Sequence, residues 1–181
     1  MGILLGFLPF LTVAVLNPTL GPAIGLPAGA LVAGLLLLRD RRAGRESSFI
    51  EFGSFVLFAG LAGWLAISGG DLSLFTVKLV VDAGLFVIVL ASMAAGRPFT
   101  LTYARRQAPE RLWNDPRFLR VNQAISGVWA LAFLVMALAE AAVVLLPGVP
   151  ASLGVLAPLA ALAAAIAFTR WYPSHVRARS S

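Results

Sequence analysis

The feature that most constrains this chain is a series of long uncharged apolar stretches, separated by short segments that carry nearly all of its charge. As a helix, about 20 apolar residues cross the roughly 30 Å hydrocarbon core of a bilayer. Of the 181 residues, 60% are hydrophobic and only 12% are charged, whereas about a quarter are charged in soluble domains. We therefore expect residues 1–181 to form a single all-α transmembrane domain, a bundle of about six helices. The expected spans are about 3–16, 23–38, 49–67, 74–95, 121–146 and 153–171.

The first two of these spans come from one uncharged stretch that prolines interrupt. The Asn17-Pro18 and Gly21-Pro22 steps are turn signals. The stretch therefore predicts a helical hairpin of two short, proline-broken spans, 3–16 and 23–38. A re-entrant hairpin is the alternative, because each arm is shorter than the usual crossing.

The basic residues predict how the chain is oriented in the membrane. Thirteen of the 14 Lys and Arg residues lie between apolar stretches or toward the C-terminus, and they define basic loops at 39–46 and 97–120 and a basic tail at 172–181. The connections 68–73 and 147–152 contain no basic residue. Because cytoplasmic loops are enriched in Lys and Arg, we expect a bacterial inner-membrane protein with both termini in the cytoplasm. The net charge of +6 does not indicate nucleic-acid binding, which needs a basic stripe on a folded polar surface.

Aromatic and basic residues at the predicted boundaries indicate contacts with the bilayer surface. Residues 99–107 are predicted to form a short helix on the membrane, with Arg105 and Arg106 toward lipid headgroups. A solvated loop that only sets topology is the alternative for this segment. Three tryptophans fall at predicted span ends, as interfacial anchors do: Trp64, Trp113 and Trp171.

Three ionisable residues lie within predicted spans, where such residues are rare and costly. Lys78 and Asp82 are one helical turn apart. With a rise of about 1.5 Å per residue, they lie about 6 Å and 12 Å below the outer boundary, and Glu140 lies about 9 Å below it. We therefore expect a mutual Lys78–Asp82–Glu140 cluster. The cluster is either structural, joining the fourth and fifth spans, or a proton or cation path along Asp82 and Glu140 with Lys78 as the counter-charge.

The fifth span carries a polar face that we expect to point to the protein interior, since lipid offers polar groups no partner. The residues on this face recur at helical spacing: Asn122, Ser126 and Trp129, followed by Phe133 and Glu140.

The sequence contains little that indicates chemistry. The chain has no cysteine, and its single histidine, His175, lies in the basic tail, which argues against bis-His haem ligation and against a Ser-His protease. Asp82 and Glu140 are too few ligands for a metal ion, and Lys78 beside them disfavours one. We expect no enzyme activity, no metal and no cofactor.

A set of residues spread over most of the chain suggests a family. The set comprises Phe7-Leu8-Pro9, Lys78 near the start of a later span, Arg97-Pro98-Phe99, Trp113, and Asn122, Trp129 and Phe133. In these residues the chain resembles the bacterial septation protein A family of small multi-span inner-membrane proteins. The resemblance implies a non-enzymatic role in cell-envelope maintenance or septation, through membrane-protein or lipid partners.

Two other functions fit the same sequence. The chain is also of a size for a small solute or ion transporter, or for the membrane substrate-binding subunit of an importer, using Asp82 and Glu140. An accessory subunit of a larger membrane complex is the third possibility. In each case the expected partners are the lipid bilayer and either other membrane proteins or a second copy of the chain.

Overall fold

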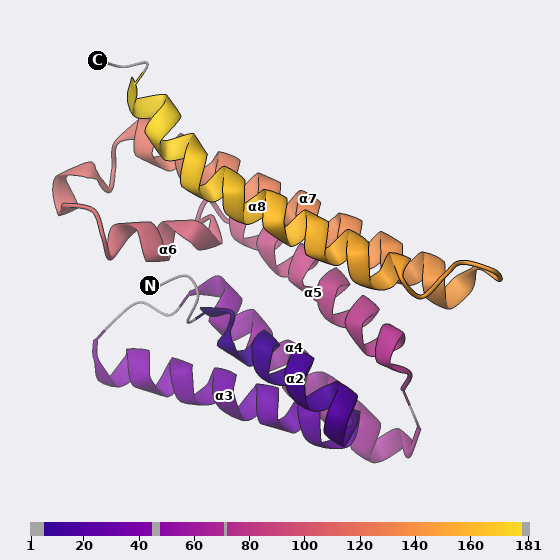
Figure 1. Cartoon of the computed structure of the whole chain (residues 1–181). Coiled ribbons are helices and arrows are strands. Elements are labelled where there is room, and N and C mark those ends of the chain that lie inside the picture. Colours follow the sequence, from indigo (N-terminus) through magenta and orange to yellow (C-terminus); the bar gives the residue numbers. More distant parts are fainter. Residues whose placement is uncertain (1–5, 45–47, 71, 179–181) are drawn as a thin grey trace.

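The computed structural model describes residues 6–44, 48–70 and 72–178, and these ranges contain helices but no strand. Figure 1 shows the helices running back and forth along one direction, except for the short α6. In chain order they are α2 (Leu8–Leu20), α3 (Pro22–Arg42), α4 (Phe49–Ser68), α5 (Leu74–Ala94), α6 (Phe99–Arg105), the 3-10 turn η1 (Glu110–Leu112), α7 (Pro116–Leu145) and α8 (Leu153–Ala178).

Five of the described helices, namely α3, α4, α5, α7 and α8, are long and apolar enough to cross a membrane. The shortest of them has 20 residues, which is about 30 Å of helix. Large apolar side chains cover their outer faces, among them Leu31 and Leu35 on α3 and Leu156 and Leu159 on α8. The prediction of an all-α membrane protein is confirmed.

The first hairpin differs from the prediction in where it turns. Pro18 and Pro27 lie inside helices, and the chain reverses at Gly21, whose positive φ of 80° suits glycine. The predicted turn at Asn17-Pro18 is therefore wrong. A proline inside an apolar helix is tolerated because unwinding it in lipid would expose more backbone groups. With 21 residues, α3 is not short, whereas the 13 residues of α2 give only about 20 Å. The predicted start of the first span at residue 3 lies outside the described residues.

The basic loops are more helical than predicted. Helix α3 continues to Arg42, and α8 continues to Ala178 through most of the predicted tail. Helix α7 begins at Pro116, five residues early, because the Asp115 side chain accepts a hydrogen bond of 2.7 Å from the Arg117 backbone N–H and caps the helix. The loop after α5 contains α6 and η1.

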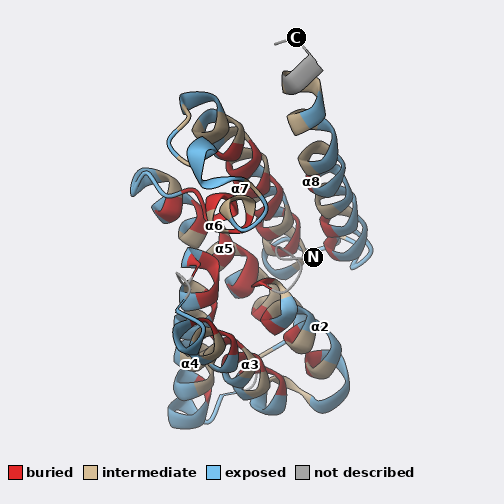
Figure 2. Ribbon diagram, turned by 90° about the vertical axis from the view of Figure 1, so that its left-hand side faces the viewer, coloured by how far each residue is buried: buried red, intermediate tan, exposed pale blue. Residues whose placement is uncertain are grey.

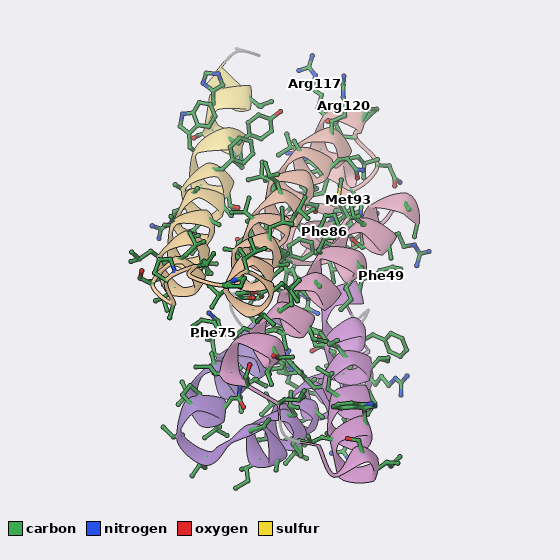
Figure 3. The ribbon with its side chains drawn as sticks, turned by 90° about the vertical axis from the view of Figure 1, so that its right-hand side faces the viewer. Phe49, Phe75, Phe86, Met93, Arg117 and Arg120 are labelled. Atoms are coloured by element: carbon green, nitrogen blue, oxygen red, sulfur yellow. The ribbon has the colours of Figure 1, made fainter. Side chains whose placement is uncertain are left out.

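The helices form two groups, α2–α4 and α5–α8, which meet where α4 packs on α5. One end of the molecule, here called the basic end, is where α3, α5 and α8 finish and α4 and α7 start (Figure 1). Helix α6 lies at this end, and Figure 3 shows Arg117 and Arg120 pointing away from the bundle there. Within the described helices and turns, Lys78 is the one basic residue that does not belong to this end.

The core is concentrated around α5, α6 and α7, whereas few residues of α8 are buried (Figure 2). An aromatic group joins the start of the chain to α7. The Phe7 ring stacks on the Trp129 ring with 5.0 Å between centroids, and the Phe99 ring meets Trp129 edge-on at 6.3 Å. Phe133 packs beside both Phe7 and Trp129.

Candidate functional site

The structure brings Lys78, Asp82 and Glu140 together between α5 and α7. The Lys78 Nζ atom lies 3.0 Å from Glu140 Oε1. The Glu140 side chain has no exposed surface, and Asp82 is 6% exposed, whereas the Lys78 side chain is 32% exposed. Because a buried charge is costly unless it is paired, this ion pair ties α5 to α7.

Lys78 also bonds to the first turn of α8, which the sequence prediction missed. Its Nζ atom donates a hydrogen bond of 2.6 Å to the Gly154 carbonyl oxygen. In a helix this carbonyl would accept from the N–H four residues later, but that residue is Pro158, which has no N–H. The ammonium group therefore supplies the donor that the proline lacks. The Gly154–Pro158 spacing is the sequence signal that could have indicated a free acceptor here.

The start of α8 also fits closely against α5. A Cβ atom on Gly154 would lie 2.6 Å from Phe75 Cε1, so only glycine allows this approach. Figure 3 shows Phe75 at the end of the bundle where α8 begins. Lys78 Nζ lies 5.5 Å from the centroid of the Phe75 ring, which is within the range of a cation–π contact. Phe75 and Gly154 thus hold the lysine from two sides.

The two carboxyl groups of the cluster influence each other. The buried Asp82 carboxyl, on a residue that is 6% exposed, interacts electrostatically with the Glu140 carboxyl. Both Glu140 oxygens are buried, and neither accepts a hydrogen bond of normal geometry from a described residue. An ionised carboxylate has no proton to donate, so a hydrogen bond between these groups requires one of them to carry a proton.

The polar face of α7 is buried and is used to hold neighbouring helices. Thr100 Oγ1 of α6 donates to the Asn122 carbonyl oxygen at 3.0 Å and lies 2.9 Å from Ser126 Oγ. Trp129 Nε1 donates to Thr169 Oγ1 of α8 at 3.0 Å. The three predicted positions of this face therefore bind α6 and α8.

A second polar group at the basic end was not predicted. Asp40 of α3 is fully buried and pairs with Arg39 at 2.9 Å and with Arg106, which follows α6. This pair joins α3 to the segment after α6. Because Asp40 stands among arginines in a predicted loop, composition alone gave it no buried role.

Glu51 belongs to the same polar group. It lies near the start of the predicted span 49–67, where water and headgroups would be expected to reach it, but it is fully buried. It accepts hydrogen bonds from the Ser48 backbone N–H at 3.2 Å and from the Tyr103 hydroxyl at 3.3 Å. Ser48 and Glu51 form a capping box at the start of α4, and their three-residue spacing is the sequence signal that could have identified it.

Tyr103 is the group of this end whose titration is most affected. It is 2% exposed, and burial raises the pKa of its hydroxyl well above the usual value, with the negative charge of Glu51 adding to the rise. The hydroxyl therefore stays protonated and keeps its hydrogen bond to Glu51.

The predicted surface residues have varied surroundings. Arg106 is directed inward to Asp40, and its side chain is 25% exposed. Arg105 Cζ lies 5.5 Å from the centroid of the Trp113 ring. Four of the seven α6 residues are buried, so α6 packs into the protein and does not lie loosely on a membrane surface. Contact of the two arginines with headgroups stays a prediction, as does anchoring by Trp113, by Trp64 (51% exposed) and by Trp171 (53% exposed).

Comparison with family models, curated proteins and solved structures gave no match. The site is therefore interpreted from its own chemistry. Within the described ranges, no three His, Cys, Asp or Glu side chains gather as metal ligands would. The groups that do gather are one ammonium and two carboxyls inside the bundle, and a set of arginines, carboxylates and a tyrosine at the basic end.

Proposed function

We propose that the protein is a non-enzymatic protein of the bacterial inner membrane, which acts in cell-envelope maintenance or septation through lipid and membrane-protein partners. The observation that carries this proposal is that the interior polar groups bond mainly to one another. Lys78 binds Glu140, Arg106 binds Asp40 and Tyr103 binds Glu51, each across two segments. These bonds join segments of the protein to one another. Partners are therefore expected to bind to the outer surface. The resemblance to the septation protein A family supports the same role.

The proposed arrangement in the membrane has the six crossings that the sequence predicts. The basic end then faces the cytoplasm, because Lys and Arg are retained on that side, and both termini lie there. Since the chain has no cysteine, single cysteines can report each side. In intact cells with a permeable outer membrane, a membrane-impermeant maleimide should label Ser152→Cys and not Gln107→Cys. Labelling of residue 107 alone would reverse the orientation.

The partner role is tested by purifying the tagged full chain in a mild detergent and identifying bound proteins by mass spectrometry. An unrelated tagged inner-membrane protein of similar size serves as the control for carry-over. We expect other membrane proteins to be recovered in a fixed ratio with this chain and to be absent from the control. Recovery with a single larger complex would identify it as an accessory subunit. A chain that purifies alone with a bound solute or ion contradicts the partner role.

Transport is the second candidate function, as a small solute or ion transporter or as the membrane substrate-binding subunit of an importer. The observation that favours it is the burial of Asp82 and Glu140, since neither buried oxygen of Glu140 accepts a hydrogen bond from a described residue. For a transporter, Asp82→Asn or Glu140→Gln should abolish transport and leave the fold intact. For a protein that works through partners, the same variants should leave the co-purified partners unchanged.

A further inference from the structure

We propose that the Asp82 and Glu140 carboxyls form a reversible proton-binding site, in which one proton is shared between them while Lys78 is charged. This site goes beyond the partner role proposed above and does not depend on it. The ligand of the two acidic residues is a proton, which they bind and release. A purely structural cluster would not need to exchange protons.

The first argument is the geometry of the pair. The Glu140 carboxyl is fully buried, and Lys78 Nζ at 3.0 Å is the positive group beside it. Its other close polar neighbour is the carboxyl of Asp82, itself 6% exposed. Two ionised carboxylates that lie close together in a buried site repel each other, and a proton on one of them removes this repulsion and allows an O–H···O bond.

The second argument is a count of charge. Between residues 52 and 77, 83 and 96, 121 and 139, and 141 and 169, the described residues of α4, α5, α7 and α8 contain no other ionisable side chain. The same holds for residues 6–38, which include α2 and most of α3. The cluster therefore contains one positive charge and two carboxyls, and it has a net charge of −1 if both are ionised. Because a net charge is costly in an apolar interior, one proton makes the cluster neutral.

The third argument is access. Lys78 is the exposed member of the three, and it lies beside the start of α8 at the end opposite the basic end. A proton therefore reaches the two carboxyls past the lysine side chain. When the proton leaves, the ammonium group remains to balance the carboxylate that faces it.

The experiment counts protonated carboxyls in the purified full chain by infrared spectroscopy, using the C=O stretching band of the neutral acid and its shift in D₂O. Asp82→Asn and Glu140→Gln each leave one carboxylate beside the charged Lys78. The cluster then has no net charge without a bound proton. At pH 7 each variant should therefore lose one protonated carboxyl relative to the wild type. Lys78→Gln should gain one, because both carboxyls must then be neutral. Glu110→Gln removes an exposed carboxyl and should leave the band unchanged.

A weaker band in Asp82→Asn and in Glu140→Gln, together with a stronger band in Lys78→Gln, supports the site. A weaker band in the wild type at alkaline pH shows that proton binding is reversible. An unchanged band in Asp82→Asn and Glu140→Gln overturns the proposal. If replacing choline chloride by sodium chloride at pH 7 removes the band from the wild type, the ligand is a metal cation and the proposal is also wrong. If Asp82→Asn or Glu140→Gln does not fold, the increase of the band expected for Lys78→Gln still tests the proposal.

Discussion

The ion pair between α5 and α7 leads to a prediction about stability. Replacing Lys78 by methionine removes the ammonium group but keeps a side chain of similar length. The fully buried Glu140 then loses its counter-charge, and the Gly154 carbonyl loses its donor. In the triple variant Lys78→Met, Asp82→Leu and Glu140→Met, the carboxyls are also replaced by apolar groups of similar shape. We expect the single variant to be less stable than the triple variant.

The magnitude follows from the groups left without a partner. At pH 7, keeping a carboxyl of ordinary pKa, about 4.3, in its neutral form costs about 3.7 kcal/mol. A buried carbonyl without a donor adds about 1–3 kcal/mol, and the lower value applies because the Lys78 side chain is 32% exposed, so water reaches the site. The single variant should lose about 4–5 kcal/mol. The triple variant keeps only the carbonyl penalty, about 1 kcal/mol, because a buried ion pair replaced by fitted apolar residues costs little.

The assay is reversible unfolding in mixed micelles with increasing SDS, followed by tryptophan fluorescence, which reports on the buried Trp129. Arg41→Met is the matched control, since it removes one positive charge from an exposed position of α3. It should lie within about 0.5 kcal/mol of the wild type. A single variant that unfolds with the triple variant, or after it, refutes the reasoning and shows that the lysine does not neutralise a buried carboxylate.

Two further predictions concern the packing of α8 and the basic end. Gly154→Ala should destabilise by about 1–3 kcal/mol because its Cβ would lie 2.6 Å from Phe75, whereas Gly60→Ala, with no atom within 4 Å of its Cβ, should be neutral or stabilising in the same unfolding assay. For Tyr103, the unfolded chain releases the hydroxyl proton near pH 10, but the folded chain holds it to higher pH. The free energy of unfolding should therefore fall as the pH rises above about 10, and it should fall less in Tyr103→Phe. Parallel pH profiles for the two proteins would show that Glu51 and burial do not hold this proton.

The parts that were predictable from sequence are those that depend on one-dimensional patterns. Apolar length predicted α4, α5 and most of α7 closely, and helical spacing placed Lys78 and Asp82 on one face. The prolines were poor predictors of the turn because a proline in an apolar helix need not end it. Pro18 lies within α2, and the chain reverses direction at Gly21.

The unpredicted contacts are those between residues far apart in the chain. Asp40 and Arg106 are separated by 66 positions, and Tyr103 and Glu51 by 52, and no local pattern pairs them. Composition assigned Asp40 to a basic loop because it ignores which way a helical side chain points. The burial of α6 was not predictable for the same reason, because the sequence of residues 99–107 does not show which side of the helix faces the protein.

The bond from Lys78 to the Gly154 carbonyl has a consequence for how the protein is made. Helix α8 leaves the ribosome after α5 and α7, and the Gly154 carbonyl in its first turn lacks a helical donor because of Pro158. The missing donor has been in the membrane since α5 was inserted, 76 residues earlier. Until α8 arrives, the lysine has only its acidic partners. Helix α8 thus docks at a position set in advance, and a chain that stalls before residue 154 remains open along the side of α7 that α8 covers.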